Sequence, residues 1–168
     1  MLSSLLPRKS TASLSETEIA STIYGLITVL AVVEILQRHP PSALACAATL
    51  FGTTLAVALV DAYSESIARI IAERHSLSGE DVQAIARNAA TVMVGAQGPT
   101  VVLLIAAAGL MSVEGALVVA RIVALASLFG YGIRVGRLLH GGYLRQVMSG
   151  LALLAIGLLV VLVKVAFH

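Results

Sequence analysis

Residues 42–74 read SALACAATLFGTTLAVALVDAYSESIARIIAER, and this stretch decides the fold class. Its first part, through Val60, is almost wholly apolar and lacks the alternation of polar and apolar residues that a barrel strand would show. A run of about 20 such residues is long enough to cross the hydrocarbon core of a bilayer as an α-helix. Good helix formers then continue from Asp61 to Arg74. We therefore predict one long helix whose second part projects from the membrane.

Four more apolar runs make the chain an all-α, polytopic membrane protein with five predicted transmembrane helices. The predicted helices cover residues 17–38, 42–74, 80–110, 113–139 and 142–167, and together they form one domain, residues 17–168, after an N-terminal tail of residues 1–16. Breakers and caps separate them: Pro40-Pro41, Ser78 with Asp81 three residues later, and Gly141-Gly142. Ser15 with Glu18 gives a similar capping pattern at the start of the first helix.

Composition supports this assignment and excludes several functions. The 168 residues are 58% hydrophobic and 12% charged, whereas soluble domains carry about 25% charged residues. The net charge of +2 comes from scattered basic residues, which argues against nucleic-acid binding. A single cysteine excludes an internal disulfide, and no nucleophile and base are spaced as in a hydrolase, so we do not expect an enzyme.

Lysines and arginines predict the orientation, because they are enriched in cytoplasmic connections. A cytoplasmic N-terminus puts eight basic residues inside and leaves only Arg38 and Lys164 outside. The eight are Arg8, Lys9, Arg69, Arg74, Arg87, Arg134, Arg137 and Arg145. Five crossings then put the C-terminus outside. We expect an integral protein of the bacterial inner (plasma) membrane, with the lipid bilayer as its first partner.

Two carboxylates on the second predicted helix are the leading site. Asp61 and Glu65 stand at i and i+4, which puts them on one helical face about 6 Å apart, near the inner edge of the hydrocarbon. Their repulsion calls for a bound cation, a shared proton or hydration at the interface. The pair would suit a divalent metal, and a two-fold dimer would bring two pairs together. The alternative is two hydrated acids balanced by Arg69.

Other polar residues fall within the predicted helices and also need a partner or a role. Glu34 and Arg121 have similar expected depths and opposite charges, so they are candidates for a structural ion pair, or Arg121 gates an acidic pathway. In the third helix, Gln97 lies near Asn88 and Met93 and just before Gly98-Pro99. The proline is expected to bend the helix, which either exposes carbonyls to a pathway or serves packing alone.

Several short segments resemble the vacuolar iron transporter family. They are Tyr24-Gly25-Leu26-Ile27, the group Ala62, Ser64, Glu65 and Ser66, and the spaced residues Gly132, Arg137, Gly141, Arg145, Gly150 and Gly157. The resemblance implies five transmembrane helices, a cytoplasmic N-terminus, a second helix extending into the cytoplasm and a dimeric pore. This chain departs from the family at the metal site. Tyr24 replaces an acid, Asp61 replaces a methionine, and the glutamate-rich cytoplasmic helices are reduced to the segment with Glu80 and Asp81.

From these residues and this resemblance we expect a homodimeric transporter or channel for a cation. A divalent metal such as iron or manganese would be the transported species, with proton coupling as an option, and no other cofactor is implied. Asp61 and Glu65 would be the metal ligands, and Glu34 and Gln97 would continue the pathway. The alternative is a non-transporting scaffold or an accessory subunit of a larger membrane complex.

Overall fold

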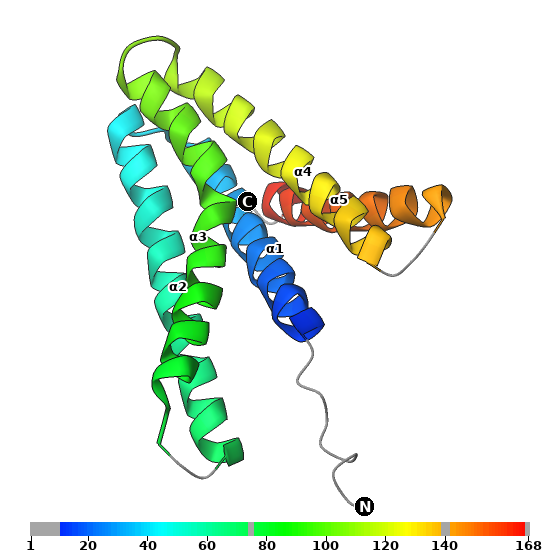
Figure 1. Cartoon of the computed structure of the whole chain (residues 1–168). Helices are drawn as coiled ribbons and strands as arrows, with labels where there is room; N and C mark the ends of the chain where they lie inside the picture. The colour runs from blue at the N-terminus through cyan, green and yellow to red at the C-terminus, as the bar shows by residue number, and fades with distance from the viewer. Residues whose placement is uncertain (1–10, 74–75, 139–141, 167–168) are drawn as a thin grey trace, which may run out of the picture.

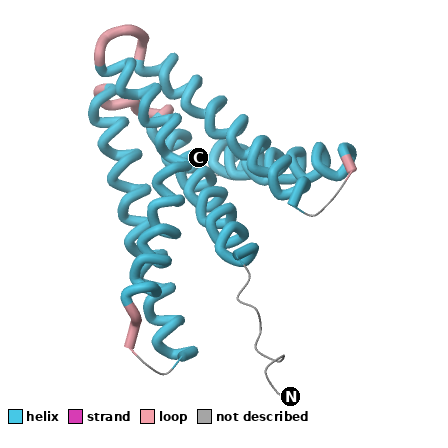
Figure 2. The backbone as a smooth tube through the Cα atoms, in the orientation of Figure 1, coloured by secondary structure: helices cyan, strands magenta, loops and turns pink. Residues whose placement is uncertain are grey.

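The computed structural model of the chain describes residues 11–73, 76–138 and 142–166, and within these ranges it is all-α, as predicted (Figures 1 and 2). Each of the five helices is long and apolar enough to cross a membrane. Their bounds are α1 Thr11–Leu36, α2 Ala43–Glu73, α3 Gly79–Ala107, α4 Val113–Leu138 and α5 Tyr143–Ala166. The chain is thus an integral membrane protein by the length and composition of its helices.

The two largest differences from the predicted bounds are the start of α1 and the end of α3. Helix α1 begins at Thr11 rather than at residue 17, so positions 15 and 18 lie inside the helix rather than at its start. Helix α3 ends at Ala107 rather than at residue 110, because Gly109 adopts a φ of 81°. The Gly109 amide then donates to the Ala106 carbonyl at 2.9 Å, and the Leu110 amide donates to the Ile105 carbonyl at 3.3 Å. This pair of bonds is the Schellman motif, which closes a helix through a left-handed glycine.

The predicted cap between α2 and α3 is confirmed. The Ser78 hydroxyl accepts a hydrogen bond from the Asp81 amide at 3.2 Å, and the Asp81 carboxylate accepts one from the Ser78 amide at 3.0 Å. This reciprocal capping box satisfies amides that the first turn of a helix leaves without partners. It fixes where α3 starts, and so which of its residues face α2.

Helix α1 is the centre of the bundle. It contacts all four other helices, while α2 and α3 form a long antiparallel pair beside it (Figure 1). In its membrane span 56% of the residues are buried, against 11% in the span of α5. The fully buried side chains of Leu26, Val29, Leu30 and Val33 form the middle of the core. Residues on α1 are therefore positioned by contacts on several sides.

Glycines allow the helices to approach closely at two crossings. Gly25 on α1 lies against the backbone of Val92 on α3, and Gly132 on α4 lies against the backbone of Gly150 on α5. A methyl group at Gly132 would come within 2.6 Å of the Gly150 Cα atom. In a bilayer, where hydrophobicity gives helices no net drive to associate, such close contact is the main source of packing energy.

We predict opposite effects of alanine at two glycines. Gly25→Ala would place a methyl group against the Val92 carbonyl, and overpacking of this kind costs about 1–3 kcal/mol. Gly52→Ala, where a methyl group would meet no atom within 4 Å, should stabilise α2 by up to about 1 kcal/mol. Thermal unfolding of the detergent-purified variants measures both changes. Equal melting temperatures would contradict the close α1–α3 contact.

Candidate cation site

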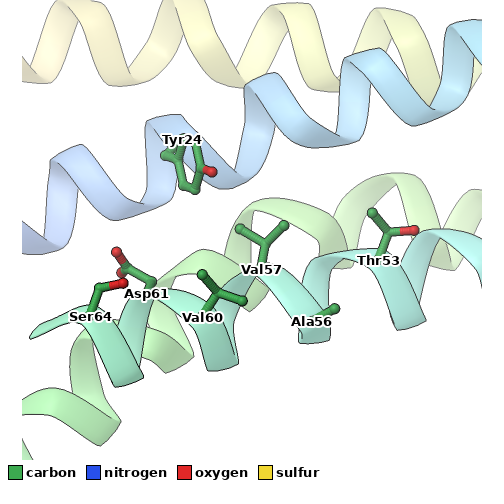
Figure 3. Close-up of a pocket in the computed structure, with 7 residues that line it drawn as sticks. All are labelled: Tyr24, Thr53, Ala56, Val57, Val60, Asp61 and Ser64. Atoms are coloured by element: carbon green, nitrogen blue, oxygen red, sulfur yellow. The ribbon is translucent and has the colours of Figure 1, made fainter. Parts of the chain in front are cut away.

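A groove of about 380 Å³ lies between α1 and α2 (Figure 3). Its lining residues are Tyr24 from α1 and Thr53, Ala56, Val57, Val60, Asp61 and Ser64 from α2. The α2 residues recur every three or four positions, which is the spacing of one helical face. Figure 3 shows the Asp61 carboxylate turned into the gap toward α1, the Ser64 oxygen turned toward Asp61, and Tyr24 on the α1 side of the gap.

Asp61 is the one acidic residue among the described residues that line this groove, and its carboxylate has no partner among them. Within the described part of the chain, no hydrogen bond or ion pair reaches its carboxylate, and the side chain is half-buried. Farther along the groove, Thr53 donates its hydroxyl to the Thr49 carbonyl at 2.8 Å and so is held on its own helix. The Asp61 oxygens therefore remain available to a cation.

Glu65 does not share a site with Asp61, contrary to the sequence prediction. Its carboxylate accepts hydrogen bonds from Arg69 at 2.6 Å and from the Asn88 amide on α3 at 3.0 Å. Arg69 in turn reaches Asp81 at 3.0 Å. These contacts neutralise Glu65 and tie α2 to α3, whereas Asp61 faces α1. Within one chain, the described contacts therefore leave Asp61 without Glu65 as a neighbouring ligand.

Other possible metal ligands in the described ranges are also too far apart to form a site. Among the described residues, no group of three or more histidine, cysteine, aspartate or glutamate side chains lies close enough to hold a metal ion. One chain thus offers a single carboxylate with neutral hydroxyls nearby. Such a set lacks the several charged ligands of a tight divalent site.

The predicted ion pair between Glu34 and Arg121 is present. Arg121 Nη1 donates to Glu34 Oε1 at 3.1 Å and to Gln37 Oε1 at 3.2 Å. Glu34 is only 7% exposed, so its charge is balanced almost wholly by Arg121. The Gln37 amide nitrogen is itself buried without a partner in the described chain. Glu34 therefore joins α1 to α4 and is not free to act as a second acid for a cation.

Gln97 lies in a different groove from Asp61. This second groove, about 320 Å³, lies between α2 and α3, and Gln97 lines it with Phe51, Met93 and Thr100 among others. At about 100° per residue, Phe51 projects from nearly the opposite face of α2 to Thr53. Asn88 is separate again, because it is buried against Glu65. The polar residues of α3 therefore do not line one path: Asn88 holds Glu65, and Gln97 lines the outward-facing groove.

The proline of α3 has the packing role that was one of the two expectations. Helix α3 continues through Pro99, which is fully buried. The neighbouring Gly98 lies close to α4, since a methyl group there would be 3.0 Å from Val123 Cγ1. Thr100 donates its hydroxyl to the Ala96 carbonyl at 2.7 Å, which satisfies one acceptor beside the proline. The proline region therefore belongs to the α3–α4 contact.

Sequence reasoning did not place Thr53 and Ser64 in the site. Their spacing from Asp61 contains the signal, because Thr53 lies about two turns before it and Ser64 about one turn after it on the same side of the helix. No spacing in the sequence indicates that a residue of α1 would line the same groove. Tyr24 enters the groove only through the way α1 packs on α2.

Comparisons of the chain with models of protein families, with curated proteins and with solved structures find no match. The geometry of the site therefore carries the functional argument.

We predict that Glu34 and Arg121 are strongly coupled in stability. Arg121→Gln leaves a buried carboxylate without its partner, a loss that costs about 3–5 kcal/mol in other proteins. Glu34→Gln combined with Arg121→Gln should cost less than the two single changes added together. Unfolding of the four proteins in detergent measures this coupling, with the exposed Arg87→Gln as control. Additive losses would show that the pair contributes nothing as a pair.

Proposed function

We propose that this protein is a membrane transporter or channel for a cation, with Asp61 as the ligand that the cation meets in the α1–α2 groove. The observation that supports this most directly is the unpartnered Asp61 carboxylate, which lies in a groove beside the hydroxyl of Ser64 and the ring of Tyr24. A carboxylate costs about 2.5–3.5 kcal/mol at the bilayer centre, and less near the edge of the hydrocarbon, where Asp61 is expected. Glu34 and Glu65 are paired with arginines of the same chain, which offsets this cost. Among the described residues, no arginine pairs with Asp61.

The chemistry of the groove favours a hard divalent cation or a proton. Carboxylate and hydroxyl oxygens are ligands that suit ions such as Mn²⁺ and Mg²⁺. A single carboxylate per chain favours weak binding, which suits an ion that must leave again. The resemblance to the vacuolar iron transporters adds support for a divalent metal, although Tyr24 stands where that family has an acid.

We further propose that two copies of the chain close this groove as a homodimer. Val60 is 65% exposed and Tyr24 is 52% exposed, so in one copy the groove faces outward from the bundle. Lipid tails cannot hydrogen-bond the Asp61 carboxylate or the nearby hydroxyls. A second copy placed groove to groove would cover these groups and bring a second Asp61 to the same path.

The alternative function is a non-transporting scaffold or accessory subunit. The observation that favours it is the structural use of Glu34 and Glu65, which shows that membrane charges in this chain can serve helix packing alone. On this alternative, Asp61 would bind a partner protein rather than an ion. A protein that moves no cation but purifies with a stoichiometric partner would support it.

Replacement of the Asp61 carboxylate tests its proposed role as the cation ligand. Wild-type protein reconstituted into vesicles should carry Mn²⁺, Fe²⁺ or protons, and Asp61→Asn should reduce the flux at least tenfold, because an amide cannot offset the charge of a cation. Glu80→Gln removes an exposed acid at the start of α3 and serves as the matched control. Fluorescent indicators inside the vesicles report the flux. Equal rates for wild type and Asp61→Asn would remove Asp61 from the mechanism.

Cysteine cross-linking tests the proposed groove-to-groove dimer. On a Cys46→Ser background, Val60→Cys in native membranes should form a disulfide-linked dimer on mild oxidation, because the proposed interface brings the two copies of residue 60 together. Leu158→Cys on α5 is the control, since Leu158 is exposed on another helix. Gel electrophoresis without reductant measures the linked fraction. Equal cross-linking at the two positions would count against a groove-to-groove interface.

A further inference from the structure

A third groove lies where α4 meets the start of α5. Its volume is about 410 Å³, and it is lined by Gly136 from α4 and by Arg145, Met148, Ser149 and Ala152 from α5. The polar groups, Arg145 and Ser149, are in the first two turns of α5, and Ala152 continues the groove along the helix. The groove therefore has a charged end and an apolar extension.

Close helix packing produces this shape. A methyl group at Gly136 would come within 2.6 Å of the Gln146 Cα atom and within 3.2 Å of the Ser149 hydroxyl oxygen. The two backbones are thus in contact beside the groove, and no side chain of α4 fills it at this point. Arg145 and Met148 remain exposed on its outer side.

Among the described residues, no acidic side chain pairs with the arginines around this groove. Residues 115–168 contain no aspartate or glutamate, yet three arginines, Arg134, Arg137 and Arg145, lie in the last turns of α4 and the first turn of α5. In the described residues all three are exposed, and the one polar contact among them is from Arg137 Nε to the Gln146 side-chain oxygen at 3.4 Å. These exposed arginines are therefore available to an anion from outside the chain.

We infer that the α4–α5 groove binds the phosphate headgroup of an anionic phospholipid. Arg145 and Ser149 would contact the phosphate, Arg137 would add charge, and an acyl chain would lie along Met148 and Ala152. Guanidinium groups pair well with phosphate oxygens, and basic residues at the membrane surface attract anionic lipids. The exposed ring of Tyr143, at the first residue of α5, fits the headgroup level where tyrosines gather.

The apolar extension is what selects a lipid over a free phosphate ion. A soluble phosphate would use only the Arg145 end, whereas a phospholipid also covers exposed Met148 and Ala152 on a helix that crosses the membrane. This site lies on a different pair of helices from the proposed cation groove, so neither proposal depends on the other.

Native mass spectrometry tests the site on the full-length protein released from nanodiscs. Wild-type protein should retain phosphatidylglycerol in preference to phosphatidylcholine. Arg145→Gln should weaken phosphatidylglycerol binding about fivefold, and Arg137→Gln with Arg145→Gln about 20-fold, since each surface arginine contributes about 1 kcal/mol to attraction of anionic lipid. Ala152→Phe should also reduce retention, because it fills the acyl part without changing the charge. Melting temperatures confirm that each variant is folded.

Two controls decide the source of any effect. Arg87→Gln removes an equally exposed arginine near the start of α3 and should change phosphatidylglycerol binding less than twofold. An equal loss for Arg87→Gln and Arg145→Gln would overturn the site in favour of general surface charge. Millimolar inorganic phosphate should not displace the lipid. Full displacement, or no effect of Ala152→Phe, would overturn the lipid assignment in favour of a simple anion site.

Discussion

Hydrocarbon offers no partner to a charged side chain, and this constraint determines which acids of this protein are structural and which one is free. Glu34 is held by Arg121 from α4, and Glu65 is held by Arg69 and by Asn88 from α3. The Glu34–Arg121 pair joins α1 to α4 and the Asn88–Glu65 contact joins α2 to α3, whereas the Glu65–Arg69 pair lies within α2. Asp61 is the exception, because it lies in the groove between α1 and α2 and no basic residue of the described ranges forms an ion pair with it. The proposed function follows from that difference.

Helix α1 takes part in both the contact with α3 and the ion pair with α4, so its position depends on both. Its Gly25 permits the close approach to α3, and its Glu34 fixes it to α4. Tyr24, next to that glycine, then faces α2 at the depth of Asp61 (Figure 3). A shift of α1 would change both structural contacts together with the width of the groove. The shape of the groove is thus maintained by residues that do not line it.

The number of helices and the Glu34–Arg121 pair could both be predicted from the sequence. The lengths of the apolar runs give the helices, and the position of a residue within its run gives its expected depth in the membrane. Local signals also predicted the Ser78–Asp81 cap, but the early end of α3 needed the φ of Gly109. Asp61 and Glu65 were expected to face one cation, but they contact different neighbours. Residues four apart differ by about 40° around a helix; Asp61 lines the groove beside Tyr24 of α1, and Glu65 accepts a hydrogen bond from Asn88 of α3. The partner of Glu65, Asn88, is 23 residues away in sequence, so no local spacing reveals it.

The acidic residues lie in about the first two thirds of the chain, where the proposed cation site is, and the remainder, where the proposed lipid site is, has only basic charged residues. Every acidic residue lies at or before Glu114, and the helices that follow carry arginines without carboxylates. A path for cations is electrostatically favourable beside α2, where Asp61 is unbalanced, and unfavourable beside Arg137 and Arg145 at the α4–α5 turn. Those arginines are better suited to hold α4 and α5 at an anionic membrane surface. Arg121 has a different role from these arginines, because it is paired with Glu34 of α1 and joins α4 to the centre of the bundle.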